Sequence, residues 1–291
     1  MNIRIIARLD IKGPNLVKGI HLEGLRVLGK PEHFARHYYE QGADELIYMD
    51  AVASLYGRNS LLDIIERTSH EIFIPLTVGG GLRSVDDIRT ALRAGADKVS
   101  LNTAAIHRPE LIREAARAFG SSTIVVSIEA IKKSNGNYEA YVDYGRESTG
   151  IDALKWAIYA VQLGAGELVV TSIDNEGTGK GFDLDLTRRI AEAVPVPVIA
   201  SGGAGKVEHI AEAITQGKAD AVSLASILHY NYVRHPEYQK ADFSAEGNTE
   251  FLRRGATFSK IQDVALPEIK DYLSQQGIEC RYQSTGVVYE E

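Results

Sequence analysis

The amino-acid sequence predicts a (β/α)8 barrel, an α/β fold in which eight parallel strands alternate with helices. Short, almost continuously apolar runs are typical of parallel strands buried on both faces. Such runs lie at residues 3–7, 45–49, 74–78, 98–101, 123–128, 167–171, 196–200 and 221–224. Between them, stretches such as 85–94 and 206–216 carry apolar residues at helical spacing. A doubly wound sheet would share this alternation, but eight units in one run fit a closed barrel better.

An internal repeat divides the predicted barrel into two halves of four units each. The segment TVGGGLRSVDDIRTALRAGADKVSLNTAAI begins at Thr77, and IASGGAGKVEHIAEAITQGKADAVSLASIL begins at Ile199. Their alignment pairs Gly80 with Gly202, and the same offset aligns ADELIYMD with AGELVVTS. Repeats this long are not the short period of a solenoid. The sequence therefore predicts a barrel built from two half-barrel repeats.

The length of 291 residues first raises the question of domain number, because domains average about 150 residues. A (β/α)8 barrel alone takes roughly 250 residues. No Pro/Ser-rich linker or change of composition separates two parts of the chain. We therefore expect one barrel domain over residues 1–291, with some surplus.

Composition excludes several classes of protein. The net charge of −7 argues against a nucleic-acid partner, which requires a basic face. The apolar runs are far shorter than the ~18 residues that span a bilayer, so no membrane association is expected. The first residues, MNIRIIARLDIKG, carry charges within their apolar stretch, unlike a signal peptide. Because Cys280 is the one cysteine, no internal disulfide forms, which favours a reducing, cytoplasmic location.

Glycine runs follow two repeat-related strands, and each run precedes a predicted helix. Glycine at a strand end lets backbone N–H groups approach an anion closely, and barrels commonly bind phosphate after strands seven and eight. For one run alone, a tight turn explains the glycines equally well. The duplication favours two phosphate sites that face each other and hold an elongated ligand. The first site comprises Gly80, Gly81, Asn102 and Thr103, and the second comprises Ser201, Gly202, Gly203, Ala225 and Ser226.

Two carboxyl groups end repeat-related strands and should face each other across the barrel mouth. Asp10 ends the first strand and Glu129 ends the fifth. Such a pair can divide acid and base roles, so we expect both residues to be catalytic. For Asp50, a helix cap or loop hydrogen bond is as good an explanation as ligand binding. Further candidate ligand contacts are Lys18 in the first loop, Asp50, Asp174 and Glu176.

Charged residues also stand at or near the starts of four strands, at the opposite end of the barrel. They alternate in charge, and two of them are repeat partners. One interpretation is a structural salt-bridge ring, and the other is a gate through which a small molecule enters from a bound partner. The sequence pattern leaves both open for Arg4, Glu45, Lys98 and Glu167.

These residues closely resemble the cyclase subunit of imidazole glycerol phosphate synthase. The resemblance covers roughly residues 3–228 and a helical segment at 267–281. It rests on IIARLDIKG, VKG, DELIYMD, TVGGG, ADKVSLNTAA, GAGELVVTSID, EGT and IASGGAGKVEH. Through EGT, it adds Gly177 and Thr178 to the expected ligand contacts.

The resemblance implies a half-repeat (β/α)8 barrel that receives ammonia from a glutaminase subunit docked at the barrel bottom. Ammonia would pass the four-residue gate and cross the barrel. At the mouth it would react with bisphosphorylated ribulosyl-formimino aminoimidazole carboxamide ribotide. The products of this lyase are imidazole glycerol phosphate and aminoimidazole carboxamide ribotide, which serve histidine and purine synthesis. The family uses no metal or organic cofactor.

The chain departs from the family pattern near the reactive centre. The family's catalytic aspartates correspond to Asp10 and Glu129, and the second carries one extra methylene. Arg8 replaces a small residue, normally cysteine, Gly13-Pro14-Asn15 replaces Asp-Gly-Arg, and Glu176 replaces aspartate. The surplus length lies mainly at 229–258, where the family has a short turn, and in a C-terminal tail at 283–291.

These departures leave two alternatives to the histidine-pathway cyclase. The first is a paralogue that delivers ammonia for the amidation of a surface-polysaccharide sugar. The altered centre and the extra segment favour it, whereas both preserved phosphate sites favour the cyclase. The second is a non-catalytic, phosphate-binding scaffold that regulates a glutaminase.

Overall fold

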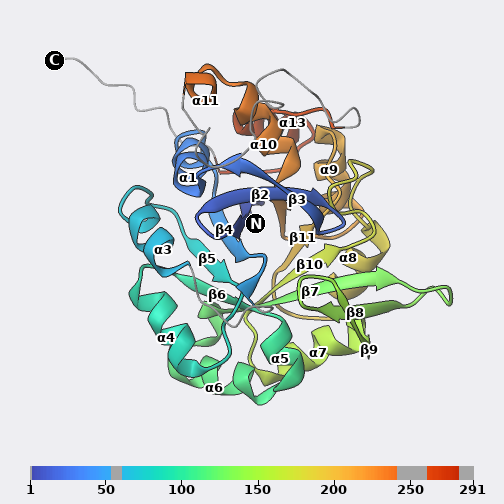
Figure 1. The fold of residues 1–291 in the computed structure, drawn as a ribbon. Helices are drawn as coiled ribbons and strands as arrows, with labels where there is room; N and C mark the ends of the chain where they lie inside the picture. The colour runs from blue at the N-terminus through green and yellow to red at the C-terminus, as the bar shows by residue number, and fades with distance from the viewer. Residues whose placement is uncertain (1, 54–60, 241–260, 282–291) are drawn as a thin grey trace.

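Eight parallel strands close into a barrel in the computed structural model of the chain, which describes residues 2–53, 61–240 and 261–281 (Figure 1). The strands pair in chain order, and closure comes from the pairing of β12 with β1 and of β7 with β10. The predicted fold is confirmed. The barrel strands are β1 (Arg4–Lys12), β4 (Glu45–Asp50), β5 (Leu76–Gly79), β6 (Lys98–Leu101), β7 (Ile124–Lys132), β10 (Glu167–Ser172), β11 (Val198–Ser201) and β12 (Ala221–Leu224).

Helices cover the outside of the barrel and alternate with its strands (Figure 1). The predicted helix at 85–94 runs over Val85–Arg93 (α4), where the Ser84 hydroxyl caps the first turn by accepting from the Asp87 N–H. None of the helices among the described residues is both long and apolar enough to cross a membrane. The other helices are α1 (Pro31–Glu40), α3 (Leu62–Ser69), α5 (Thr103–His107), α6 (Glu110–Phe119), η1 (Ser121–Thr123), α7 (Ala153–Leu163), α8 (Leu184–Ala191), α9 (Val207–Thr215), α10 (Ser226–Arg234), α11 (Pro236–Lys240) and α13 (Leu266–Gln275).

Strand boundaries differ from the predicted ones for identifiable reasons. β5 begins at Leu76 and β11 at Val198, each directly after a proline, because proline has no N–H to donate to a neighbouring strand. Each half of the barrel also has an equivalent hydrogen bond at the start of this strand. The Leu76 N–H donates to Asp97 Oδ2 at 2.8 Å, and the Val198 N–H donates to Asp220 Oδ2 at 2.9 Å. The equivalent bonds agree with the duplication predicted from the sequence.

Two antiparallel hairpins extend the sheet beyond the barrel and were not predicted. Each continues a repeat-related strand: β1 pairs with β2, and β7 pairs with β8. As a result, β1 and β7 extend further than expected, to Lys12 and Lys132. The hairpin strands are β2 (Asn15–Ile20) with β3 (Glu23–Gly29), and β8 (Tyr138–Val142) with β9 (Glu147–Asp152).

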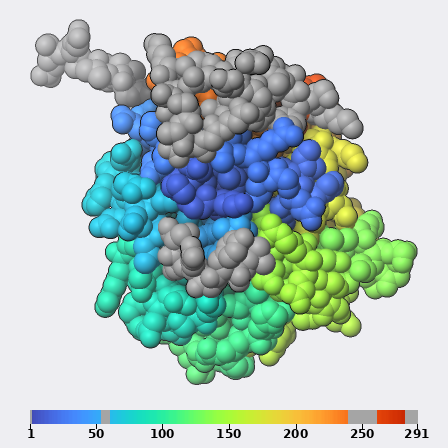
Figure 2. All heavy atoms as spheres, in the orientation of Figure 1, coloured from blue at the N-terminus to red at the C-terminus, as the bar shows by residue number. Residues whose placement is uncertain are grey.

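The tips of the two hairpins meet over the barrel mouth. Leu22 at the first tip and Tyr144 at the second pack with Ala51 and Ile173 in a buried apolar cluster. The β2–β3 hairpin, in blue, crosses the face shown in Figure 2. These contacts place an apolar cover above the carboxyl-terminal ends of the strands and remove the side chains beneath it from water.

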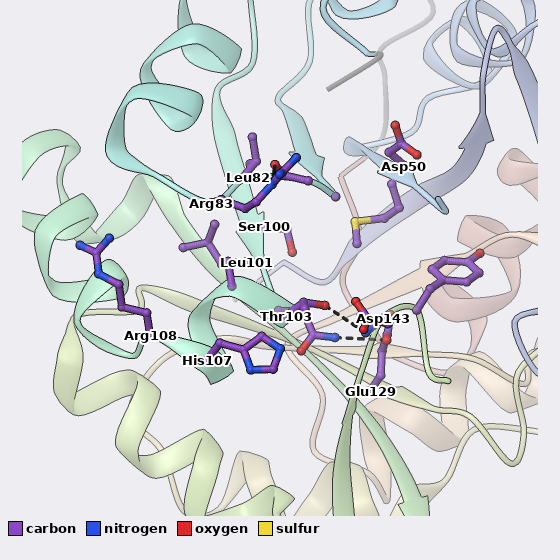
Figure 3. A pocket seen from close by; sticks show the side chains of 16 residues that line it. Asp50, Leu82, Arg83, Ser100, Leu101, Thr103, His107, Arg108, Glu129 and Asp143 are labelled. Atoms are coloured by element: carbon purple, nitrogen blue, oxygen red, sulfur yellow. Dashed lines mark hydrogen bonds between the residues drawn. The ribbon is translucent and has the colours of Figure 1, made fainter. Parts of the chain in front are cut away.

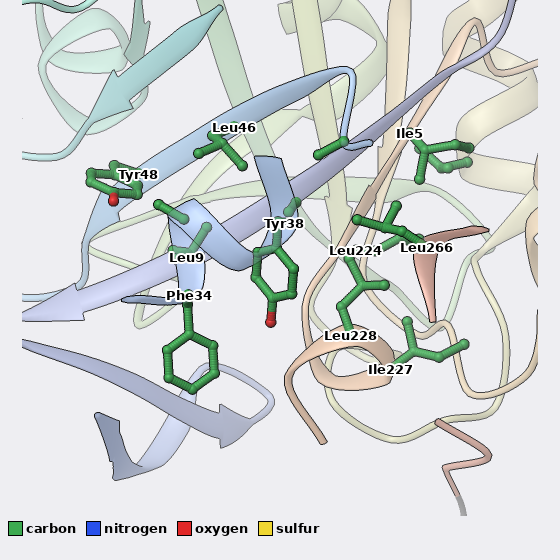
Figure 4. Close-up of a cluster of buried hydrophobic side chains, with 14 of the residues drawn as sticks. Ile5, Leu9, Phe34, Tyr38, Leu46, Tyr48, Leu224, Ile227, Leu228 and Leu266 are labelled. Atoms are coloured by element: carbon green, nitrogen blue, oxygen red, sulfur yellow. The ribbon is translucent and has the colours of Figure 1, made fainter. Parts of the chain in front are cut away.

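Helix α10 packs on α1 through aromatic and aliphatic side chains, several of which are drawn in Figure 4. His229 at this contact is fully buried, and its Nδ1 forms a 2.6 Å hydrogen bond with the Tyr38 hydroxyl. Residues 229–240 of the predicted insertion thus form the end of α10, the connecting His235 and α11. The rest of that insertion, 241–258, and the tail at 283–291 lie outside the described residues, so both stay predictions.

We expect Tyr38→Phe to lower the free energy of unfolding by about 1–3 kcal/mol, because it leaves a buried imidazole nitrogen without its partner. Urea denaturation followed by circular dichroism measures this loss. Tyr159→Phe is the control, because the Tyr159 side chain is exposed on α7. Equal stabilities of the two variants would contradict a stabilising role for the Tyr38–His229 bond.

Candidate active site at the mouth of the barrel

Asp10 and Glu129 lie in the barrel mouth on the repeat-related strands β1 and β7, as predicted. Both are almost completely buried, with exposed fractions of 1% and 2%. Arg8, two residues before Asp10 on the same strand, is also buried and donates from Nε to Asp10 Oδ1 at 2.9 Å. Alternate residues of a strand point to one face, so Arg8 and Asp10 both point into the barrel.

The guanidinium of Arg8 reaches through the barrel interior to β10 and β11, which do not pair with β1. Its Nη1 donates to Thr171 Oγ1 on β10 at 3.2 Å and to Ser201 Oγ on β11 at 3.4 Å. The other terminal nitrogen, Nη2, is buried and has no protein hydrogen-bond partner among the described residues. Arg8 therefore fixes Asp10 and keeps one strong donor available inside the site. Ser201, predicted as a phosphate contact, lies within hydrogen-bond distance of Arg8.

The surroundings of Asp10 favour its carboxylate form. Burial alone would raise its pKa, but the charges of Arg8 and Lys18, with hydrogen bonds from Arg8 and Tyr144, hold the pKa below its usual value. An ionised carboxylate in this position can accept a proton from a bound molecule.

The surroundings of Glu129 have the opposite effect. Burial raises its pKa to about 7, and the negative charges of Asp10 and Glu176 add to this, against the charge of Arg8 and a hydrogen bond from the Gly145 N–H. Asn102 Nδ2 donates to Glu129 Oε2 at 3.1 Å. Two carboxyl groups whose pKa values are pushed apart in one site are suited to separate acid and base roles.

The first loop and the sixth loop meet at a buried ion pair. Lys18, on β2, forms a salt bridge with Glu176, and both side chains are buried. The His21 N–H also donates to the Glu176 carbonyl at 2.9 Å. Gly177 is required here, because a Cβ at its position would lie 2.6 Å from the Gly19 carbonyl oxygen. Lys18, Glu176 and Gly177, predicted as ligand contacts, thus hold the hairpin against the mouth.

A cavity of about 460 Å³ opens at the first predicted phosphate site (Figure 3). The cavity is lined by residues that the sequence predicted and by others that it did not suggest. Glu129 lines the cavity, whereas Asp10 does not. The predicted lining residues are Asp50, Gly80, Gly81, Asn102, Thr103 and Glu129, and the additional ones include Arg83, His107, Arg108, Asp143 and Tyr144.

The cavity offers several groups that suit an anion. Gly80 and Gly81 have φ values of 95° and 73°, and a Cβ on Gly80 would lie 2.6 Å from the Asp50 carbonyl oxygen. Glycine is therefore required for this turn. The exposed side chain of Arg83 adds positive charge at the cavity, whereas the charge of Arg108 is balanced by a salt bridge with Glu114. Arg83 lies two residues after the glycine run, so its position in the sequence could have identified it as a candidate phosphate contact.

Two predicted contacts in this cavity have structural partners. Asn102 Nδ2 donates to Glu129 and also to the Tyr141 carbonyl at 3.2 Å, so it positions Glu129. Thr103 Oγ1 accepts from the Asp143 N–H at 3.0 Å (dashed in Figure 3).

The second predicted phosphate site is formed by the ends of β11 and β12, and its residues do not line the cavity of Figure 3. Gly203 has a φ of 111°, and a Cβ there would lie 2.0 Å from the Gly181 carbonyl oxygen. The Gly181 N–H donates to the Gly203 carbonyl at 2.8 Å. A Cβ on Gly202 would lie 3.0 Å from the Ser172 carbonyl oxygen. Ala225 and Ser226 begin α10. The glycines thus make room for the loop after β10.

Three other residues predicted as ligand contacts form hydrogen bonds within the protein. Asp50 Oδ1 accepts from the Val52 N–H at 3.0 Å, as the loop interpretation suggested. Asp174 is exposed, and its carboxylate accepts from the Lys132 N–H at 2.9 Å at the end of β7. Thr178 Oγ1 donates to the Asn175 carbonyl at 2.7 Å within its own loop.

The four charged residues at the strand starts form a closed ring of ion pairs. Arg4 contacts Glu45 at 2.7 Å and Glu167 at 2.5 Å, and Lys98 contacts each glutamate at 3.1 Å. Both glutamates are buried. A separate cluster of buried apolar residues comes from the barrel strands: Ile6, Ile47, Met49, Val125, Val169, Ile199 and Ala221.

Tyr144 is a functional candidate that the sequence did not suggest. Its hydroxyl hydrogen-bonds to Asp10, and burial raises its own pKa well above the usual value. It stands in a turn with a φ of 59°, which is uncommon for a bulky residue. Because the hairpin itself was not predicted, nothing in the sequence placed Tyr144 near Asp10.

Comparisons with known proteins agree on one family. The family described as histidine biosynthesis protein matches residues 4–234. Three relatives are each named imidazole glycerol phosphate synthase subunit HisF. The relative from Legionella pneumophila is 60% identical over 207 residues, 71% of this chain and 98% of its own. The relative from Alkaliphilus metalliredigens is 48% identical over 238 residues (82% and 94%), and that from Trichormus variabilis is 51% identical over 230 residues (78% and 90%).

Proposed function

The chain belongs to the histidine biosynthesis family as a HisF-type subunit of imidazole glycerol phosphate synthase, and from this premise we propose that Asp10 and Glu129 carry out its ammonia-dependent cyclisation. The reaction would be that of a lyase acting on the bisphosphorylated ribulosyl-formimino aminoimidazole carboxamide ribotide. The observation that carries the proposal is the buried pair of carboxyl groups whose pKa values are shifted in opposite directions.

The pair divides the proton transfers that such a reaction needs. Asp10, held ionised by Arg8, accepts a proton from the reacting ammonia or substrate. Glu129, with a pKa of about 7, is partly protonated near neutral pH and donates to a leaving group or to a developing negative charge. The apolar cover formed by the hairpin tips excludes water, which strengthens these electrostatic interactions.

The cavity beside Glu129 supports the binding of one substrate phosphate. Gly80 and Gly81 allow close backbone approach, and Arg83 supplies positive charge. Ser201, Gly202, Gly203, Ala225 and Ser226 remain our proposed contacts for the other phosphate, by analogy with the repeat. The contacts of Asp174 and Thr178 favour structural roles for these two residues.

Being a subunit implies a complex with a partner protein, and we propose that this partner is a glutaminase docked at the barrel bottom. The ring of Arg4, Glu45, Lys98 and Glu167 would then be the entry for ammonia. Neutral ammonia tolerates the apolar barrel interior formed by Ile6, Val125 and Val169 better than a charged ion does. The single buried cysteine, Cys280, is consistent with the cytoplasm as the location.

We expect Lys98→Glu to lower the glutamine-dependent rate about tenfold, a change of 1.4 kcal/mol, while the ammonium-dependent rate stays near that of the parent. The substitution places a third carboxylate beside Glu45 and Glu167 and breaks the ring. Steady-state rates with glutamine plus glutaminase, and with an ammonium salt, are compared. Lys155→Glu, on the exposed face of α7, is the control. An unchanged ratio of the two rates would favour the salt-bridge ring as a purely structural feature.

The direct test of the proposed function supplies the purified protein with the bisphosphorylated substrate and an ammonium salt. We expect a decrease in substrate absorbance and the release of both products. Binding of the substrate without turnover would favour the regulatory scaffold, and absence of binding would contradict the phosphate sites. The shared name of the relatives favours the histidine-pathway cyclase over the scaffold and over the sugar-amidating paralogue.

A further inference from the structure

A second cluster of potential ligand groups lies outside the barrel, where α1, the end of α10 and α11 come together (Figure 1). His37 belongs to α1, His235 follows α10, and Glu237 belongs to α11. One nitrogen or carboxylate oxygen from each side chain lies within 4.8 Å of the other two. The fold thus brings together residues almost two hundred positions apart in the chain.

His37 has the environment of a metal ligand. Its side chain is only 8% exposed, and its ring stacks on Tyr232 with the centroids 3.9 Å apart and the planes at 21°. Burial, together with the nearby His235, lowers the pKa of His37 to about 4. The ring is therefore a neutral imidazole with a lone pair, the form that binds metals.

The spacing of the three groups suits an intervening ion better than direct bonds. Glu237 Oε2 lies 4.0 Å from His37 Nδ1 and 3.7 Å from His235 Nδ1, both too far for a hydrogen bond. Zinc bonds of about 2.0–2.1 Å in a tetrahedron place ligand atoms about 3.3 Å apart. The Glu237 carboxylate oxygen would therefore move about 0.7 Å closer to His37 Nδ1 and about 0.4 Å closer to His235 Nδ1 on binding zinc. The Glu237 N–H also approaches His235 Nδ1, at 3.4 Å, and holds these two residues together.

We propose that His37, His235 and Glu237 form a site for a divalent zinc ion. Two imidazoles and one carboxylate are a recurrent zinc ligand set, which leaves a fourth position for water or a further ligand. A cavity of about 870 Å³, lined by His37, Glu237 and Glu40 among others, adjoins the cluster and gives the ion access to solvent. The ion would fasten α11, at the start of the predicted insertion, to α1. This site is separate from the proposed active site and does not depend on it.

Zinc titration of the full-length protein tests the proposal after chelator treatment and removal of the chelator. Competition with a chromogenic zinc indicator reports stoichiometry and affinity. We expect one zinc ion per chain, and at least tenfold weaker binding in His235→Ala and Glu237→Gln. Both positions are solvent-accessible, so these variants should fold like the parent. His70→Ala removes an exposed histidine elsewhere and should bind as tightly as the parent.

Cobalt(II) added in place of zinc gives a second readout that is independent of enzymatic activity. Tetrahedral coordination by nitrogen and oxygen should produce visible d–d absorption in the parent and in His70→Ala, and this absorption should be lost in Glu237→Gln. Absence of stoichiometric zinc binding in the parent would overturn the proposal. Equal zinc affinity in the parent, His235→Ala and Glu237→Gln would overturn it as well.

Discussion

Asp10→Asn should lower the ammonia-dependent rate of cyclisation by about 10²- to 10⁴-fold, the range that general acid–base catalysis contributes. The amide keeps the size of the side chain, and its oxygen can still accept from Arg8 Nε. It loses the negative charge that the guanidinium and Lys18 stabilise, and with it the ability to accept a proton. The measurement is kcat with saturating ammonium salt, so that the glutaminase partner plays no role.

A matched control separates this chemical effect from a general effect of removing a carboxylate. Asp271→Asn makes the same substitution at an exposed aspartate on α13, outside the candidate site. We expect a rate within a few-fold of the parent. Substrate affinity of Asp10→Asn should also stay close to that of the parent, since Asp10 does not line the cavity. An Asp10→Asn rate equal to that of Asp271→Asn would remove Asp10 from the mechanism.

The barrel and its carboxyl pair were predictable because both follow from periodic and repeated features of the chain. Buried parallel strands are continuously apolar, and duplication places Asp10 and Glu129 at matching strand ends. The ring at the barrel bottom followed from the same reasoning, since strand starts in a parallel barrel share one end. Local sequence therefore sufficed wherever the position along a strand determined the position in space.

The two hairpins could not be predicted, because their turns use unusual residues. The two-residue turn between β2 and β3 has positive φ values at His21 and Leu22, where Asn-Gly or Asp-Gly would be expected. The turn after β8 likewise has positive φ values at Asp143 and Tyr144. Tertiary packing of Leu22 and Tyr144 in the apolar cover stabilises these turns against their local preference. Without the hairpins, neither the cover nor the hydrogen bond from Tyr144 to Asp10 was foreseeable.

The residues that depart from the family pattern have identifiable partners in the structure. Arg8 occupies space inside the barrel that a small residue would leave open, and it forms bonds to Asp10, Thr171 and Ser201. Glu176, which replaces an aspartate, reaches Lys18 and joins the sixth loop to the hairpin. Together these residues build a charged network around the longer Glu129. The charges of Arg8 and Glu176 shift the pKa of Glu129 in opposite directions, so single reversions to the family residue should change the protonation of Glu129.

Glu129→Gln should also lower kcat by about 10²- to 10⁴-fold, with a distinctive dependence on pH. Burial holds the pKa of Glu129 at about 7, so a proton-donating Glu129 is present below this pH and is lost as the pH rises through it. We therefore expect the rate of the parent to fall above about pH 7, whereas the residual rate of Glu129→Gln should lack this decline. Glu147→Gln, at an exposed glutamate on β9, should keep the profile of the parent.

The same titration affects folding, and it supplies an independent check on the protonation state of Glu129. Its pKa is raised from 4.5 to about 7 in the folded chain, so the folded state binds more protons than the unfolded state between these values. The contribution of Glu129 to stability is therefore fully present below about 4.5 and is lost as the pH rises through about 7. Because glutamine does not ionise, Glu129→Gln should lose less stability than Glu147→Gln between pH 5 and 8, about the window of this titration. Equal losses in urea denaturation would mean that Glu129 is already ionised at low pH, and the acid role would then pass to another group.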